Sequence, residues 1–221
     1  MTTTVRVKIC CIGSPEEARL AVRYGADALG LVGKMPSGPG VIPDATIRQI
    51  AAQVPPPVAT FLLTSEVVPA EVAAHHRRTL TTAIQIVDAV DVSAYPILRK
   101  ELPGVKIVQV VHVQGESALP WAIEVSQWVD AILLDSGRKD RQVKELGGTG
   151  RVHDWKISRK IRDVVGVPVF LAGGITPENA AQAVSAVEPF GLDICSGVRT
   201  EGKLDEAKLS RLFAALRSPA T

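Results

Sequence analysis

Short apolar runs alternate with amphipathic stretches along the whole 221-residue chain. The runs are rich in β-branched residues, which is typical of buried strands, and the stretches between them have the apolar spacing of helices. The runs cover residues 5–12, 28–32, 58–64, 83–87, 105–111, 131–136, 167–174 and 191–197. The helical stretches cover residues 14–25, 43–54, 68–80, 92–102, 117–129, 155–165, 176–187 and 205–216. The pattern therefore predicts eight consecutive βα units.

Strands that are apolar throughout belong to a parallel sheet covered by helices, and eight such units close into a barrel. We therefore expect an α/β protein with a (β/α)8 TIM-barrel fold, and a single domain over residues 1–221 because no linker interrupts the units. The main alternative is a doubly wound open sheet, which needs fewer units and a glycine-rich turn after the first strand. Residues 13–18, "GSPEEA", predict a helix start instead, with Ser14 as N-cap, Pro15 at the first helical position and Glu17 completing a capping box.

Composition narrows the class of protein without naming a function. A formal net charge of +2 and an aromatic content of 4% indicate neither a basic surface nor stacking platforms for nucleic acid. The N-terminus has no secretory pattern and no run is long enough to span a membrane, so we expect a cytoplasmic protein. The three cysteines have no metal-ligand spacing, so neither a disulfide framework nor a metal site is expected. No feature of the sequence indicates the oligomeric state.

Alternation along the first run separates its side chains into two sets. Lys8 and Cys10 share one face, and Val7, Ile9 and Cys11 share the other. The apolar set is expected to face the helices, so Lys8 and Cys10 should face the barrel interior, and Cys11 should be a packed small hydrophobe. Cys10 ends the inward-facing row at the carboxyl end of the strand, where the chemistry of such barrels is found. Cys10 is therefore a candidate reactive thiol, with a packing residue as the alternative.

Six motifs connect the chain with a known family of barrel enzymes. They are "KIC" at 8–10, "GADALG" at 25–30, "AILLDSG" at 131–137, "GGTGRVHDW" at 147–155, "VPVFLAGGITPENAAQAV" at 167–184 and "GLDICSG" at 191–197. In these motifs the sequence resembles the phosphoribosylanthranilate isomerase family of tryptophan biosynthesis. The resemblance implies an isomerase that needs no cofactor. Its reaction would be an Amadori rearrangement, from aldose to ketose, of an N-linked ribose 5-phosphate.

The resemblance assigns Cys10 as the general base and Asp135 as the general acid. The reaction needs such a pair, because the ring oxygen must gain a proton and C2 must lose one. A thiol with an ordinary pKa of about 8.5 is mostly protonated at neutral pH, so a thiolate base needs a neighbouring cation, and Lys8 is the candidate. Asp193 matches a family aspartate near the substrate's amino group. For Asp135, a helix cap or a buried ion pair is the alternative interpretation.

Two loops after the last two strands predict a phosphate site. Gly173 and Gly174 follow the seventh run, and Ser196 and Gly197 end the eighth, where barrels commonly bind phosphate with backbone N–H groups. Gly148 lies in the segment 147–150, which follows a charged stretch and precedes the sixth helix. We expect this segment to be a lid over the phosphosugar substrate, with a surface loop as the alternative.

Several positions depart from the family pattern. Pro39 stands where the family has an arginine that holds the anthranilate carboxylate, and Asp88 ends a "QIVD" that replaces "QLHG". Arg199 replaces a glutamate in "SGVR", and Cys11 replaces a glycine after the base. Lys34 or Arg199 could supply a cation for the carboxylate. Two alternatives therefore stay open, an enzyme for another phosphoribosyl amine and a non-catalytic phosphosugar-binding barrel.

The remaining histidines and tryptophans have simpler interpretations. His112 ends the fifth run and is a possible substrate contact. His75 and His76 fall within the third helical stretch, where we expect a solvated face rather than a ligand pair. Trp121 and Trp128 are seven residues apart and are expected to share a core face of one helix.

Overall fold

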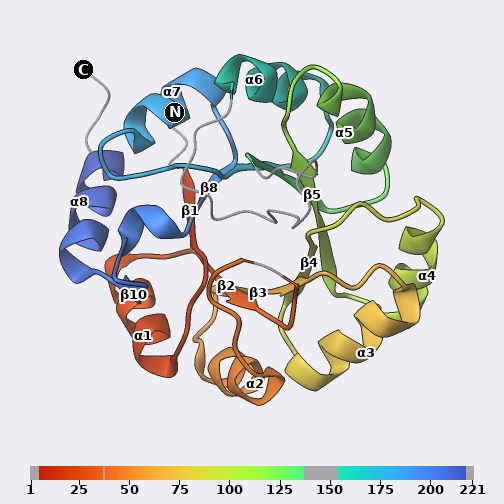
Figure 1. Ribbon diagram of the computed structural model, residues 1–221, viewed down its shortest axis with the longest axis horizontal. Coiled ribbons are helices and arrows are strands. Elements are labelled where there is room, and N and C mark those ends of the chain that lie inside the picture. The colour runs from red at the N-terminus through yellow and green to blue at the C-terminus, as the bar shows by residue number, and fades with distance from the viewer. Residues whose placement is uncertain (1–4, 37, 137–153, 218–221) are drawn as a thin grey trace.

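A computed structural model describes residues 5–36, 38–136 and 154–217. Its eight parallel strands form a closed barrel in the order β1 to β8, and the helices form a ring around it (Figure 1). The strands are β1 (Arg6–Ile9), β2 (Ala28–Val32), β3 (Ala59–Thr64), β4 (Ala83–Ile86), β5 (Lys106–His112), β6 (Ala131–Asp135), β7 (Val169–Leu171) and β8 (Gly191–Ile194). The helices are α1 (Pro15–Tyr24), α2 (Asp44–Gln53), α3 (Pro69–Thr79), α4 (Ala94–Glu101), α5 (Ala118–Ser126), α6 (Trp155–Val164), α7 (Ala180–Val187) and α8 (Glu206–Arg217). The predicted (β/α)8 barrel is confirmed.

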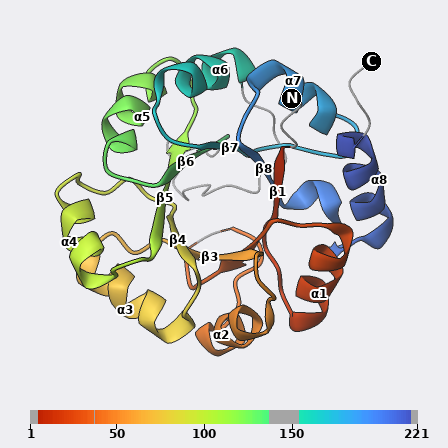
Figure 2. The same cartoon turned by 180° about the vertical axis from the view of Figure 1, so that it is seen from behind.

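Alternation along the strands produces two layers of buried side chains. The larger layer lies between the strands and the helices and includes Ile9, Leu31 and Leu62. A second cluster fills the barrel and includes Phe61 and Phe170, whose rings meet edge to face with centroids 5.9 Å apart. Figure 2 shows the same closed ring of strands from behind. A polar side chain buried inside this barrel costs free energy unless it has a partner.

The start of α1 partly follows its predicted capping pattern. Ser14 is the N-cap, its hydroxyl accepts a hydrogen bond from the Glu17 backbone N–H at 3.3 Å, and Pro15 is the first helical residue. The Glu17 carboxylate does not return to the N-cap residue as a capping box requires. It accepts from the Gly13 backbone N–H at 2.8 Å and pairs with Arg199. The capping-box prediction was therefore wrong for Glu17, because a partner far along the chain takes its side chain.

Strand β8 closes the barrel onto β1, and Figure 1 shows the two side by side. The short helix η1 (Ser196–Val198) and the two-stranded ribbon of β9 (Arg199–Thr200) and β10 (Lys203–Leu204) follow β8. From this segment Arg199 bonds the Glu17 carboxylate at 3.0 and 3.1 Å and donates to the carbonyl groups of Cys10 and Cys11. The first and last βα units are therefore joined by side chains as well as by the strand ladder.

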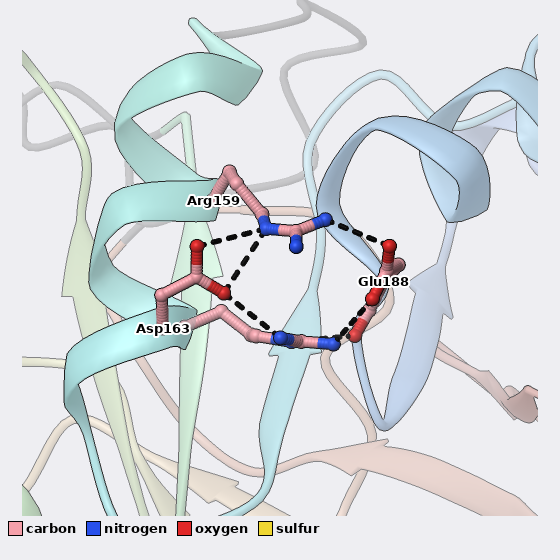
Figure 3. A network of polar contacts seen from close by, with 4 residues as sticks. Arg159, Asp163 and Glu188 are labelled. Atoms are coloured by element: carbon pink, nitrogen blue, oxygen red, sulfur yellow. Dashed lines mark hydrogen bonds and ion pairs between the residues drawn. The ribbon is translucent and has the colours of Figure 1, made fainter.

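A network of charged side chains joins α6 to the end of α7 (Figure 3). Arg159 bonds Asp163 at 2.9 Å and Glu188 at 2.9 Å, and Arg162 bonds the same two carboxylates at 2.8 Å. All four side chains are 31–55% exposed, so water screens their attraction. The network orients the two helices and adds little to the free energy of unfolding.

Cys11 does not occupy the position that strand alternation predicts. Strand β1 ends at Ile9, and Cys11 has a left-handed backbone with φ of 61°. This turn ends the alternation, so the Cys11 side chain joins the barrel cluster together with Cys10. The expectation that Cys11 faces the helices with Val7 and Ile9 was therefore wrong. A left-handed conformation costs a residue with a Cβ about 1–2 kcal/mol.

His75 and His76 are buried, and the expectation of a solvated face was wrong. His75 is 2% exposed, with Nδ1 3.0 Å from the Thr64 hydroxyl and Nε2 3.1 Å from the Asp44 carboxylate. His76 Nε2 lies 2.7 Å from the Thr81 carbonyl oxygen. Both nitrogens of His75 and Nε2 of His76 have partners outside α3, which a helical spacing does not reveal.

The prediction that Trp121 and Trp128 share a core face of one helix was also wrong. Helix α5 ends at Ser126, so Trp128 lies beyond it and is 40% exposed. Trp121 is half-buried and packs against the core between strands and helices. The two side chains do not share a helical face because the helix is shorter than its apolar pattern.

The left-handed backbone at Cys11 predicts an unusual order of stability among its variants. Cys11→Gly should be more stable than Cys11→Ala, because glycine adopts φ of 61° without the Cβ penalty. Urea unfolding of both variants would measure the difference, which we expect to be about 1 kcal/mol. Cys10 has no left-handed backbone and is the matched control, so there the alanine variant should be the more stable. Alanine more stable than glycine at residue 11 would contradict the argument.

Candidate active site

A buried ion pair lies inside the barrel where β1 meets β8. Lys8 and Asp193 are register partners across these strands, and Lys8 Nζ donates to Asp193 Oδ1 at 2.7 Å. The Lys8 side chain is 0% exposed and that of Asp193 is 7% exposed. The expectation that Lys8 faces the barrel interior agrees with this geometry. The pair places a positive charge in a space from which water is largely excluded.

Cys10 lies next to this ammonium because β2 leaves room for both groups. Gly30, in the middle of β2, faces them, and a Cβ at Gly30 would lie 2.6 Å from Cys10 Sγ and 3.0 Å from Lys8 Nζ. Both atoms therefore lie beside the same point of the glycine backbone. Cys10 is 5% exposed and follows the last residue of β1. The thiol and the ammonium are thus neighbours at the carboxyl end of the barrel.

Phe61 from β3 provides an apolar surface beside the ammonium. Its ring centroid lies 5.4 Å from Lys8 Nζ, within the range of a cation–π contact. Burial alone would lower the pKa of Lys8, but the Asp193 carboxylate, followed by Cys10, holds that pKa above its ordinary value. Lys8 therefore stays protonated, and its charge is a permanent part of the site.

Asp135, the last residue of β6, is buried in the same mouth of the barrel. Burial raises the pKa of Asp135 to about 6, and the negative charge of Asp193 acts in the same direction. The Ser136 backbone N–H, which donates to Asp135 Oδ1 at 2.7 Å, and the Lys8 ammonium oppose the rise. A carboxyl group with this pKa exists in both protonation states near neutral pH. It can give a proton in one step and hold a negative charge in the next.

The predicted phosphate loops lie next to each other. A Cβ at Gly197 would lie 2.0 Å from the Ile175 carbonyl oxygen, so only a glycine permits this contact between the loops after β8 and β7. Within the described part of the chain, the backbone N–H groups of Gly174, Ser196 and Gly197 donate no hydrogen bond. Gly173 precedes them at the end of β7. Backbone donors from two loops are thus available to an anion at one place.

Arg199 does not point a charged fork toward a substrate. Its terminal nitrogens bond Glu17 and the carbonyl groups of Cys10, Cys11 and Gly202. The Arg199 side chain is 9% exposed. Its charge is therefore balanced by Glu17. The Arg199 side chain joins the first and last βα units of the barrel.

The other predicted contacts that the structure describes follow β2 and β4 or end β5. Lys34 is exposed in the loop after β2 and makes no ion pair with the described residues, and Pro39 is exposed farther along this loop. Asp88 is buried just after β4, and its carbonyl oxygen accepts from Gln109 at 2.9 Å. His112 ends β5 as the register partner of Asp135, with Nε2 3.1 Å from the Val87 carbonyl oxygen. Gly148 and the predicted lid at 147–150 lie outside the described residues.

Two site residues were missed by the sequence analysis. Gly30 carries a usable signal, because a glycine inside an apolar strand often marks a close approach of another group. Phe61 carries none, because its contact with Lys8 depends on how β1 and β3 face each other across the barrel.

Among residues 5–36, 38–136 and 154–217, no group of histidine, cysteine and acidic side chains could hold a metal ion. None of the helices in these ranges is long and apolar enough to cross a bilayer.

Comparison with known proteins gives consistent matches over nearly the whole chain. A family model described as N-(5'-phosphoribosyl)anthranilate (PRA) isomerase matches residues 7–215. The N-(5'-phosphoribosyl)anthranilate isomerase of Methanocella arvoryzae is 34% identical over 208 residues, which cover 94% of this chain and 95% of the relative. N-(5'-phosphoribosyl)anthranilate isomerase 2 of Methanosarcina mazei is 36% identical over 207 residues, covering 93% and 91% of the two chains.

Solved structures agree with these sequence matches. A phosphoribosyl anthranilate isomerase in complex with reduced 1-(o-carboxyphenylamino)-1-deoxyribulose 5-phosphate has a TM-score of 0.80 and 26% identity. The match covers 96% of this chain and 98% of that one. The similarity therefore includes the whole barrel and not one motif.

The raised pKa of Asp135 predicts how pH changes stability. Between about pH 4 and pH 6 the folded chain holds a proton that the unfolded chain has lost, so this group makes the free energy of unfolding fall as pH rises through that range. Asp135→Asn removes the penalty and should be the more stable protein at pH 8, by up to about 3 kcal/mol. The gain should disappear near pH 4, and urea unfolding across this range would measure it.

Asp130→Asn is the matched control with the opposite sign. Although burial opposes it, hydrogen bonds from the Ile107 backbone and from Arg99 and Lys106 lower the pKa of Asp130. Its variant should lose stability at pH 8 and approach the parent protein in acid. An Asp135→Asn difference that stays constant from pH 4 to pH 8 would show that this carboxyl is not strained by burial.

Proposed function

The chain belongs to the N-(5'-phosphoribosyl)anthranilate isomerase family, and we propose that it isomerises N-(5'-phosphoribosyl)anthranilate in tryptophan biosynthesis. The reaction is an Amadori rearrangement, in which the aminoaldose becomes a 1-amino-1-deoxyketose with the same phosphate. The ligand named for the similar solved structure is the reduced form of such a ketose. The observation that carries the proposal is the presence of Cys10 and the buried Asp135 around one permanently charged lysine.

Asp135 is the general acid of the proposed mechanism. Its carboxyl group gives a proton to the ring oxygen of the sugar while the C1–O bond breaks and the nitrogen forms an iminium bond to C1. A carboxyl with an ordinary pKa near 3.9 is almost fully ionised at neutral pH and makes a poor acid. The pKa of about 6 that burial gives Asp135 keeps a useful fraction protonated.

Cys10 is the general base of the next step. Its thiolate removes the proton from C2 of the open-chain iminium, which leaves a neutral enolamine. The enol then tautomerises, C1 gains a proton and C2 becomes the ketone. Lys8 attracts the negative charge of the thiolate before the transfer, and Asp193 keeps the ammonium in place. Lys8 and Asp193 are thus positioning residues for the base.

The phosphate of the substrate binds the loops after β7 and β8 in this proposal. Gly173 and Gly174 from one loop and Ser196 and Gly197 from the other would present backbone N–H groups to its oxygens. Because such donors need no side-chain charge, the site can bind a phosphosugar although the net charge of the chain is only +2. Fixing the phosphate places C1 and C2 of the sugar between the acid and the base.

The anthranilate carboxylate needs a different partner from the expected arginine, since Pro39 has no donor. We assign this role to Lys34, which is exposed just after β2 at the carboxyl end of the barrel and has no ion pair within the described residues. Arg199 is excluded from it because Glu17 and backbone carbonyl groups occupy both of its terminal nitrogens. The relatives reported above are N-(5'-phosphoribosyl)anthranilate isomerases, so we do not propose another phosphoribosyl amine, and a mere binder would not need the proton-transfer pair.

The acid and base assignment predicts two strongly impaired variants. Cys10→Ser and Asp135→Asn should each lower kcat by roughly 10²-fold or more, the scale of losing a general acid or base. Steady-state kinetics on folded protein would measure this. Cys11→Ala is the matched control, since it removes the adjacent thiol and should keep kcat within a few-fold. If Cys11→Ala were inactive and Cys10→Ser active, the assignment of the base would be wrong.

The role of Lys34 predicts a change in affinity rather than in rate. Lys34→Met should raise KM for the anthranilate adduct by about tenfold and leave kcat nearly unchanged, as expected for an interaction of equal strength in substrate and transition state. The same variant should have unchanged KM for the phosphoribosyl adduct of aniline, which lacks the carboxylate. Lys100→Met, on α4 away from the mouth, is the control. An equal rise in KM for both adducts would mean that Lys34 does not read the carboxylate.

A further inference from the structure

Three thiols meet where β1 and β8 end. Cys10 and Cys11 follow β1, Cys195 follows β8, and the Cys10 backbone N–H donates to the Ile194 carbonyl at 2.8 Å. Cys10 and Cys11 lie in the cluster that fills the barrel, and Cys195 packs against the same cluster. All three are free cysteines. The proposed mechanism uses only Cys10, so the other two thiols have no role in it.

The left-handed turn at Cys11 creates this cluster. With a regular strand, Cys11 would face the helices, away from Cys195. Its φ of 61° instead turns the side chain toward the barrel mouth. Arg199 fixes the arrangement by bonding the carbonyl groups of Cys10 and Cys11 while lying four residues after Cys195. The two chain segments that carry the thiols are therefore held together at fixed spacing.

The Cys11 and Cys195 thiols differ in access and in charge. Cys195 is half-buried, whereas Cys11 is 6% exposed. A hydrogen bond from Cys11, assisted by the positive charge of Arg199 and against the effect of burial, lowers the pKa of Cys195. Hydrogen bonds to Cys10 and Cys195 and burial raise the pKa of Cys11. The more exposed of the two cysteines is thus the one whose thiol loses its proton more readily.

We propose that Cys195 and Cys11 are a peroxide-sensitive pair, in which Cys195 reacts with hydrogen peroxide and Cys11 resolves the product. The Cys195 thiolate attacks one peroxide oxygen, the O–O bond breaks, and hydroxide leaves, which gives a sulfenic acid at Cys195. Cys11 then attacks that sulfur, and the sulfenic oxygen leaves as water with the thiol proton. Two thiols are oxidised to one disulfide, and one peroxide is reduced by two electrons.

Cys10 is a poor partner for Cys11 in such a bond. Adjacent Cα atoms are about 3.8 Å apart, which is less than the roughly 4.4 Å minimum of ordinary disulfides. A Cys11–Cys195 bond would withdraw the Cys11 thiol from Cys10 and would tie it next to Ser196 and Gly197. Both the proposed base and the proposed phosphate loop would then be disturbed. Oxidation should therefore lower activity, and a thiol reductant should restore it.

The experiment titrates the folded protein with hydrogen peroxide at pH 7.5 and follows its thiols. The parent protein should go from three titratable thiols to one, and dithiothreitol should return all three. Trypsin leaves Cys10 and Cys11 together in residues 9–19 and Cys195 in residues 163–199, so mass spectrometry should find these two peptides cross-linked. Cys10→Ser assigns the bond, because a cross-link in this variant can involve only Cys11.

The variants make the result decisive without reference to activity. Cys10→Ser should form the cross-link at the parent rate, whereas Cys195→Ser should form none and lose its thiols at least tenfold more slowly. Cys11→Ser should stop at a sulfenic acid on Cys195, which dimedone would trap. A cross-link that disappears in Cys10→Ser, or three thiols that react no faster than in urea-unfolded protein, would overturn the proposal.

Discussion

The buried ion pair between Lys8 and Asp193 is the interaction on which the rest of the site depends. It crosses the joint between the first and last strands, and neither group is accessible to water to any large extent. Removing one partner from such a pair leaves an uncompensated charge and typically costs about 3–5 kcal/mol. The pair thus stabilises the closed barrel as well as the proposed site. A substitution that removes either charge would weaken both.

The same pair sets the electrostatics of the proposed acid and base in opposite ways. Asp193 raises the pKa of Asp135 by repulsion between carboxylates, while Lys8 lowers that pKa and attracts charge on Cys10. For Asp135 burial has the larger effect, so its pKa of about 6 is well above the ordinary value of an aspartate. One ion pair can therefore support an acid and a base within the same space, because its two ends act on different neighbours.

The repeated βα pattern was enough to predict the barrel, and strand alternation was enough to predict that Lys8 faces inward. Both depend on local periodicity. The partner of Lys8 could not be found in this way, because Asp193 is 185 residues away and meets it only after the ring closes. Asp135 was found by resemblance, but its raised pKa comes from burial that no single strand reveals.

Each wrong prediction has an identifiable structural cause. The face of Cys11 was predicted wrongly because this residue, with φ of 61°, ends the alternation. A run of apolar residues does not indicate a left-handed backbone. His75 and His76 were misplaced because their partners lie on α2, β3 and the loop after α3. Glu17 was misplaced because Arg199 competes with the helix terminus for its carboxylate. For the histidines and Glu17, a contact made by the fold overrides the local rule.

The distance in sequence between Lys8 and Asp193 also bears on how the chain is made. Synthesis begins at the N-terminus, so β1 leaves the ribosome long before β8 exists. Until residue 193 emerges, the ammonium of Lys8 has no counterion and keeps its hydration by staying in water. An incomplete barrel therefore cannot bury its first strand in the native way. The last strand of the barrel to be translated therefore supplies the counterion of the first, so this part of the core can form only once β8 has been made.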